Sequence, residues 1–210
     1  MILASLAVSV GAGTFGRIDL HSPPYQPQGG AFSIWGVIYV AILISGLAIM
    51  HENVSWYAVA PLAVSLVCSG GWLFAVQFKN KLFSAVLISV SALSAMACVV
   101  LLRPDLHRPI DWAISIGPSL LAGWLGVAMG LGINVAYHAQ TETDLSQWVL
   151  APGGILVATA GIVGGAPITG VPLIWAAIFS MPSMIRIVVG GLGIVTVIGG
   201  GLSYFLQRQS

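Results

Sequence analysis

The sequence predicts an all-α fold, a polytopic membrane helix bundle of seven or eight spans. Two observations lead to this fold class. Of the 210 residues 58% are apolar, with a mean hydropathy of +0.99, and only 7 basic and 6 acidic residues are present. A soluble domain carries about 25% charged residues, because polar side chains must cover much of its surface. A chain this poor in charge therefore belongs in a bilayer.

The charged residues gather in short clusters, which divide the chain into apolar stretches. At about 1.5 Å of rise per residue, roughly 20 residues cross the hydrocarbon core. In order along the chain, we expect spans at residues 2–15, 31–50, 57–78, 82–102, 113–137 and 148–163, and two more apolar runs that flank Pro182 and Arg186.

Two of the expected spans are short. Residues 2–15 form a tilted or truncated span, or a signal peptide; we favour a span, because the basic start of a signal peptide is missing. Residues 171–181 end at Pro182, which either kinks one long helix or separates two. We favour two helices there.

The charge pattern also bears on function. A formal net charge of +1 offers no basic patch, so we expect no nucleic-acid partner. Except for Arg186, no charged residue falls near the interior of an apolar segment, and Cys68 and Cys98 lack the spacing of metal ligands. We therefore expect no catalytic residues, no metal site and no enzyme. With eight spans, three basic residues fall on one side of the membrane and four on the other. A difference of one charge leaves the orientation open.

Aromatic residues fall into two groups. One group lies at predicted helix ends, where amphipathic rings suit the headgroup layer: Trp56, Trp112, Trp148 and Tyr204. The other group forms stripes within the spans at helical spacing: Phe32, Trp35 and Tyr39; Ser65, Ser69 and Trp72; and Trp124, Ala128 and Leu131. If these faces converge, they enclose a pocket for a planar apolar ligand. The alternative is that the stripes only pack helices together.

Small residues form a further stripe in residues 113–137: Ala122, Gly126, Gly130 and Asn134. Residues four apart share one helix face, and small side chains let two helix backbones approach closely. We expect a packing face, within the bundle or in a homodimer. The glycines of the last segment indicate a similar surface.

A known family is suggested by the stretch Tyr25-Gln-Pro27-Gln-Gly29-Gly-Ala-Phe32-Ser33-Ile34-Trp35-Gly36-Val-Ile-Tyr39. It resembles the loop and second helix of the tryptophan-rich sensory protein family, also called the translocator protein family, and especially its longer bacterial-type branch. Ser69-Gly-Gly-Trp72-Leu-Phe74 and Gly123-Trp124-Leu-Gly-Val-Ala128 are similar to the family's third-helix and fifth-helix motifs. Leu173-Ile-Trp175-Ala176 resembles a motif in the longer branch's extra helices.

The resemblance implies a five-helix core over residues 1–140 and two or three additional C-terminal transmembrane helices over 141–210. It implies a ligand site for tetrapyrroles or sterols with Trp35, Ser69, Trp124 and Ala128 in the pocket, and a lid containing Tyr25 and Pro27. This sequence departs from the family pattern where Ser69 replaces an asparagine and Gly132 occupies the place of another.

Three functions follow as hypotheses. The first is a non-enzymatic membrane receptor, sensor or carrier, with a porphyrin or another tetrapyrrole as its possible ligand. The second is a structural or pigment-associated subunit of a larger membrane complex, and the third, the weakest, is an enzyme. We expect a multi-pass protein of the inner (plasma) membrane if the source is bacterial, or of an organelle membrane if it is eukaryotic.

Overall fold

The computed structural model describes residues 29–103, 108–180, 183–207 and 209. Every regular element in these ranges is helical, which confirms the all-α class. The elements are η2 (Gly29–Ser33), α2 (Ile34–Glu52), α3 (Trp56–Gln77), α4 (Lys81–Leu102), α5 (Pro109–Thr141), η3 (Gln147–Val149), α6 (Leu150–Val163), η4 (Pro167–Gly170), α7 (Val171–Ser180) and α8 (Ser183–Gln207). The expected span at residues 2–15 lies outside the described residues.

Five of the described helices are long and apolar enough to cross a membrane: α2 with η2, α3, α4, α5 and α8. The apolar helices α6 and α7 are shorter. The protein is therefore a polytopic membrane helix bundle, as its composition predicts. The chain beyond residue 170 forms two helices, and α7 and α8 pack against each other, so the choice of two helices over one kinked helix is confirmed.

The boundaries of the fifth span were predicted too narrowly. We expected residues 113–137, whereas α5 runs from Pro109 to Thr141. Proline suits the first turn of a helix, and Asp111 in that turn is favoured by the positive end of the helix dipole. The charged residues therefore mark the ends of α5 itself rather than the loops outside it. At the other end, Glu142 takes a left-handed conformation (φ 57°) and stops the helix.

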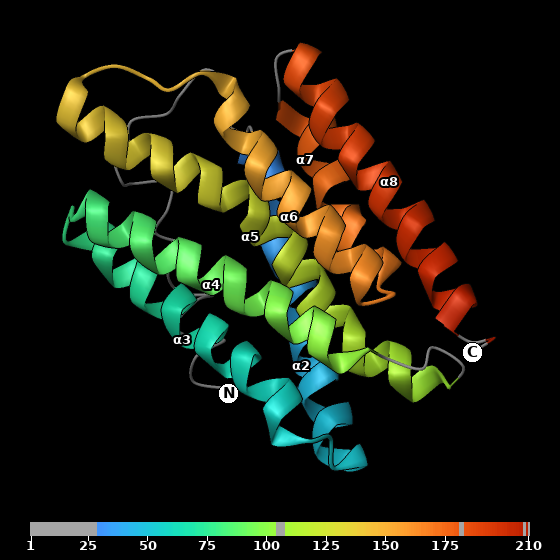
Figure 1. Cartoon of the computed structure of the whole chain (residues 1–210). Coiled ribbons are helices and arrows are strands. Elements are labelled where there is room, and N and C mark those ends of the chain that lie inside the picture. Colours follow the sequence, from blue (N-terminus) through green and yellow to red (C-terminus); the bar gives the residue numbers. More distant parts are fainter. Residues whose placement is uncertain (1–28, 104–107, 181–182, 208, 210) are drawn as a thin grey trace.

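Helix α5 lies at the centre of the bundle (Figure 1). On one side α2 and α4 pack against it, and α3 packs along the outside of α4. On the other side α6 and α7 contact it, and α8 covers both of these helices. With 33 residues α5 is about 50 Å long, longer than the hydrocarbon core is thick.

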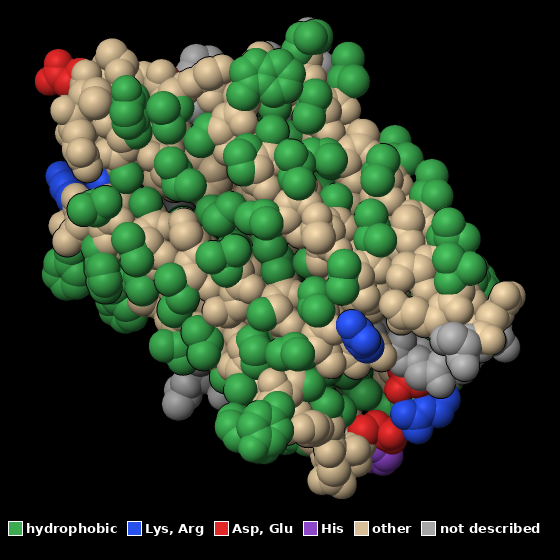
Figure 2. Space-filling view, in the orientation of Figure 1, with side chains coloured by type: hydrophobic (Ala, Val, Ile, Leu, Met, Phe, Trp, Pro, Cys, Tyr) green, Lys and Arg blue, Asp and Glu red, His purple; other side chains and the backbone are tan. Residues whose placement is uncertain are grey.

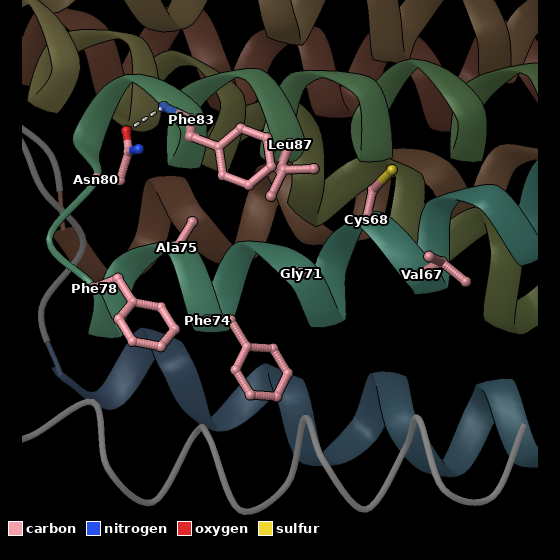
Figure 3. A pocket seen from close by; sticks show the side chains of 9 residues that line it. All are labelled: Val67, Cys68, Gly71, Phe74, Ala75, Phe78, Asn80, Phe83 and Leu87. Carbon is pink, nitrogen blue, oxygen red and sulfur yellow. Dashed lines mark hydrogen bonds between the residues drawn. The ribbon is translucent and has the colours of Figure 1, made fainter.

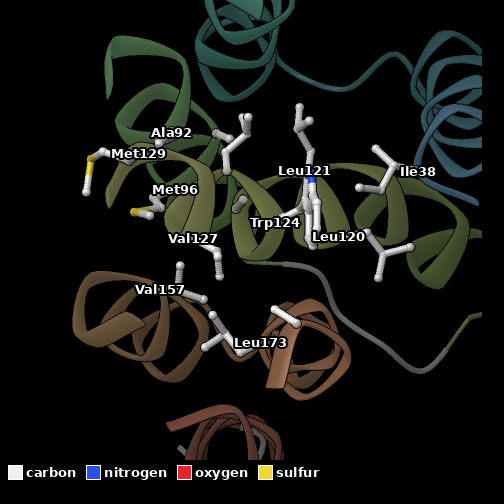
Figure 4. Packing of buried hydrophobic residues seen from close by; sticks show 14 of the residues in the cluster. Ile38, Ala92, Met96, Leu120, Leu121, Trp124, Val127, Met129, Val157 and Leu173 are labelled. Atoms are coloured by element: carbon white, nitrogen blue, oxygen red, sulfur yellow. The ribbon is translucent and has the colours of Figure 1, made fainter. Parts of the chain in front are cut away.

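A single hydrophobic core joins all of these helices. Figure 4 shows Trp124 and Val127 of α5 between Ile38 of α2, Val157 of α6 and Leu173 of α7. The proposed division at residue 140 into a core and additional helices stays a prediction, but the C-terminal helices share this core with α2, α4 and α5.

Apolar side chains cover much of the visible outer surface, and the charged residues lie near the helix ends (Figure 2). The three tryptophans expected at helix ends, Trp56, Trp112 and Trp148, are exposed. An apolar exterior with charges at its margins is the surface that a bilayer requires.

Candidate functional site

Four aromatic side chains meet where the start of α2 contacts the middle of α5. We call Phe32, Trp35, Tyr39 and Trp124 the aromatic cluster. The ring of Trp35 stacks on Tyr39 with centroids 5.5 Å apart and lies edge-to-face with Trp124 with centroids 6.3 Å apart. Phe32 lies edge-to-face with Trp124 at 5.9 Å. Two of the aromatic stripes recognised in the sequence thus converge on one place.

The aromatic cluster is deep in the protein. Trp35 is 7% exposed and Trp124 is 3% exposed, while Phe32 and Tyr39 are half-buried at the margin of the core. The periodicity explains this arrangement, since residues at i, i+3 and i+7 share the face of α2 that packs on α5. The site therefore combines two buried indole rings with two partly accessible aromatic rings.

Helix α7 supplies a third side of the site, which sequence reasoning missed. The indole Nε1 of Trp175 donates a hydrogen bond to the carbonyl oxygen of Ala31, 3.0 Å away, in η2. The ring centroids of Phe179 and Trp175 are 4.4 Å apart, and the Phe179 ring also approaches Gly30. One available signal was the tryptophan itself, because a buried indole N–H needs an acceptor.

The Trp175 hydrogen bond gives a testable prediction. Trp175→Phe should keep most of the ring packing but lose the bond to Ala31, so we expect unfolding to become easier by about 1 kcal/mol. The matched control is Trp148→Phe, because Trp148 is 46% exposed. Thermal unfolding in detergent should show a lower midpoint for the first variant alone, and equal midpoints would contradict the role of the bond.

Ser69 does not belong to the aromatic cluster in this structure. Its hydroxyl lies 2.7 Å from the Ser91 hydroxyl of α4, and the Ser65 hydroxyl lies 3.0 Å from the same atom. Ser91 in turn donates to the carbonyl oxygen of Ser65 at 2.8 Å. These three buried serines join α3 to α4, so the Ser69 hydroxyl is already engaged within the protein.

The other predicted ligand residues are dispersed. Trp72 on α3 and Ala128 on α5 are both half-buried and pack against the core. Their ligand-binding roles stay predictions. Tyr25 and Pro27, the expected lid residues, lie outside the described residues.

The small-residue stripe of α5 faces α6 inside the bundle. Gly126 closely approaches Gly153 and Val157, and Gly130 approaches Leu150. Ala122 and Asn134, at the two ends of the stripe, are fully buried. The contact is thus intramolecular along the length of the stripe.

The position where the family has a second asparagine also faces a neighbouring helix. A Cβ atom on Gly132 would lie 2.7 Å from the side chain of Ile88 on α4. A larger side chain there would push α4 away. Both departures from the family pattern, Ser69 and Gly132, therefore fall on contacts with α4.

An ionic cluster joins the end of α2 to the start of α5. The Arg108 guanidinium donates to both carboxylate oxygens of Asp111, at 3.0 and 2.8 Å, and to Glu52 at 3.0 Å. The hydrogen bond and the charge of Asp111 raise the pKa of Arg108, and Glu52 adds to this effect. Arg108 therefore stays protonated and holds the two helix ends together.

Metal ligation has no support in the part of the chain that the structure describes. No group of three or more His, Cys, Asp or Glu side chains there is placed to hold an ion. Near the centre of the bundle, the described residues present aromatic rings, backbone groups and small side chains.

Comparison with known proteins identifies a family. A family model described as TSPO-like protein matches residues 7–188 of the chain. No curated protein and no solved structure matches. The matched region includes the aromatic cluster, the serine contacts and Trp175.

Proposed function

The chain belongs to the TSPO-like protein family, and on that premise we propose that it is a membrane receptor, sensor or carrier for a planar hydrophobic ligand such as a tetrapyrrole or a sterol. The observation that carries the proposal is the convergence of Phe32, Trp35, Tyr39 and Trp124 from η2, α2 and α5. Flat aromatic faces in an apolar surrounding suit a flat apolar ligand, because stacking and burial need no polar partners.

Polar groups of the proposed site are already engaged within the protein, which supports recognition by shape. The Trp175 indole N–H is already bonded to Ala31, and the Ser69 hydroxyl is bonded to Ser91. A ligand that required several directed hydrogen bonds would have to break contacts that hold helices together. We therefore propose that stacking and apolar burial supply most of the affinity.

The proposed site includes further residues that the family resemblance suggests. Trp72 and Ala128 would extend the apolar wall, Ser69 would be its polar edge, and Tyr25 and Pro27 would cover the ligand as a lid. The proposed role is non-enzymatic, since the aromatic cluster supplies surfaces for binding and no acid–base pair.

A role as a structural or pigment-associated subunit is the alternative. It was motivated by glycine-rich faces that would dock partner helices. Gly126 and Gly130 of α5 and Gly193 and Gly200 of α8 pack against other parts of the same chain, which leaves less of these faces for a partner. Binding of a planar ligand is therefore the proposal that we favour.

Titration of purified protein with protoporphyrin tests the proposal. We expect saturable quenching of tryptophan fluorescence and a shift of the porphyrin absorption band. Trp35→Leu and Trp124→Leu should each weaken binding about tenfold, which corresponds to ~1.4 kcal/mol and lies within the range for an aromatic contact. The absorption band gives affinity without depending on the number of tryptophans that remain.

Trp56→Leu is the matched control, because Trp56 is 64% exposed at the start of α3, away from the cluster. It should bind protoporphyrin like the unmodified protein. Competition by a sterol would distinguish a general apolar site from a tetrapyrrole site. If Trp35→Leu and Trp124→Leu both bind with unchanged affinity while remaining folded, the proposed site is wrong.

A further inference from the structure

A second feature with the character of a binding site lies on the outside of the bundle, between α3 and α4. It is a groove of about 440 Å³, and its lining is almost entirely apolar. Phe83 and Leu87 of α4 extend toward α3 at the position of Gly71, where no side chain fills the space (Figure 3). Phe74 and Phe78 line the groove from α3. The volume falls within the ~300–1,000 Å³ of ordinary ligand sites.

The groove opens to the bilayer rather than to water. Phe74 is 58% exposed, Phe78 80% and Phe83 52%, and all three belong to membrane-spanning helices or their ends. In a bilayer, apolar rings exposed on the outside of these helices would face lipid. Any molecule that enters the groove sideways therefore comes from the hydrocarbon phase.

The length of the groove matches one leaflet. Along α3 the lining runs from Val67 to Phe78, and 11 residue steps of a helix cover about 16 Å. Half of a hydrocarbon core ~30 Å thick is about 15 Å. The groove thus extends from the α3–α4 turn to roughly the depth at which a lipid acyl chain ends.

The turn at the mouth of the groove is basic. Lys79 and Lys81 flank Asn80, which lines the groove and uses its side-chain oxygen to accept a hydrogen bond from the Phe83 backbone N–H at 3.0 Å. The amide nitrogen of Asn80 remains as a donor at the rim. Among the residues that the structure describes, neither lysine forms an ion pair, and the two cations stand on either side of Asn80.

We propose that this groove binds one acyl chain of an anionic glycerophospholipid, with the phosphate held at the α3–α4 turn by Lys79, Lys81 and Asn80. Basic residues beside a groove between membrane helices are the arrangement that selects anionic lipid headgroups. The apolar groove is as long as one leaflet, which suits an acyl chain, and two lysines at its end suit an anionic headgroup. The groove therefore fits a lipid better than a planar ligand. This inference goes beyond the proposed function and does not use the aromatic cluster.

Native mass spectrometry of the full-length protein in detergent tests the inference. The probes are dioleoyl phosphatidylglycerol, which is anionic, and dioleoyl phosphatidylcholine, which has the same chains and no net charge. The dissociation constant of the first bound lipid is measured for each. Each lysine contributes about fivefold, or ~1 kcal/mol, so we expect phosphatidylglycerol to bind about 25-fold more tightly.

Two variants separate the headgroup from the chain. Lys79→Asn combined with Lys81→Gln should abolish the preference for phosphatidylglycerol and leave phosphatidylcholine unchanged; asparagine tolerates the positive φ of 56° at position 79. Gly71→Leu should fill the groove and weaken both lipids at least tenfold. It should fold, because a Cβ at Gly71 meets only the Leu87 side chain, at 3.4 Å.

Matched controls come from the same two helices. Gly70→Leu adds the same side chain next to the groove, at a position with no neighbouring atom within 4 Å of its Cβ. Arg103→Asn removes a cation at the opposite end of α4, also at positive φ. Both controls, and Trp124→Leu from the aromatic cluster, should bind phosphatidylglycerol normally.

Three results would overturn the inference. These are equal affinity of the unmodified protein for the two lipids, unchanged phosphatidylglycerol binding by Gly71→Leu, and displacement of the lipid by protoporphyrin in direct competition. Loss of porphyrin binding in Trp124→Leu with normal lipid binding would support two separate sites. Failure of the porphyrin titration would leave the lipid result standing.

Discussion

Gly153→Ala should destabilise the protein by about 3 kcal/mol, near the upper end of the cost of overpacking a core. Gly153 on α6 lies directly against the backbone carbonyl group of Gly126 on α5; a Cβ at Gly153 would overlap that oxygen and lie 3.0 Å from its carbon. A flexible side chain can rotate away from such a contact, but helix backbone cannot. The two helices must therefore separate, and the packing of Val157 on α5 is lost with their contact.

The measurement is the free energy of unfolding in mixed micelles, compared with that of Gly191→Ala. Gly191 lies on α8, and outside the adjacent turns of its own helix no atom lies within 4 Å of the Cβ that alanine would add there. That control should be neutral or slightly more stable, since alanine favours helix by up to ~1 kcal/mol over glycine. Equal stabilities for the two variants would mean that the close contact of α5 with α6 does not hold the bundle together.

Asn134→Ala should also lower stability by about 3 kcal/mol. Asn134 is fully buried near the end of α5. Its amide nitrogen donates to the carboxylate of Asp144 at 3.0 Å, and its oxygen accepts from the Leu145 backbone N–H at 2.6 Å. A neutral hydrogen bond contributes about 1 kcal/mol and one to a charged group about 2 kcal/mol. Alanine removes both.

The loop that Asn134 holds leads from α5 to η3, so its release should be visible locally. Limited proteolysis should cut residues 142–146 faster in Asn134→Ala than in the unmodified protein. Gln140→Ala is the control, because Gln140 is exposed on the same helix and precedes the same loop. If both the cleavage rate and the free energy of unfolding are unchanged, Asn134 does not stabilise the loop.

Most of the helices were predictable because they are long apolar stretches between charges, whereas α6 and α7 are separated by an uncharged loop. Most predicted boundaries fall within two residues of the observed ones. The failure at α5 has a clear cause: the charge pattern assigns Arg108 and Asp111 to a loop, whereas they pair with each other across the first turn of the helix. Charge shows where a chain meets water, and a helix can extend into that layer.

The site was predictable in part. Spacing along one helix placed Phe32, Trp35 and Tyr39 on a common face, and their contact with Trp124 followed from the packing of that face on α5. Contacts between helices carry no such periodic signal. Neither the bond from Trp175 to Ala31 nor the contact of Ser69 with Ser91 is visible in spacing, because each joins residues of different helices.

The hydrogen bond from Trp175 to Ala31 can form only late in the synthesis of the protein. Its two residues are 144 positions apart in the chain. At ~5–20 residues per second, α2 is made about 7–29 s before its partner in α7 leaves the ribosome. During this interval the start of α2 lies in the membrane without the last helix pair. A chain that stops after α5 would therefore keep the ring contacts of Trp35 with Trp124 but lack the anchor that holds η2 in place.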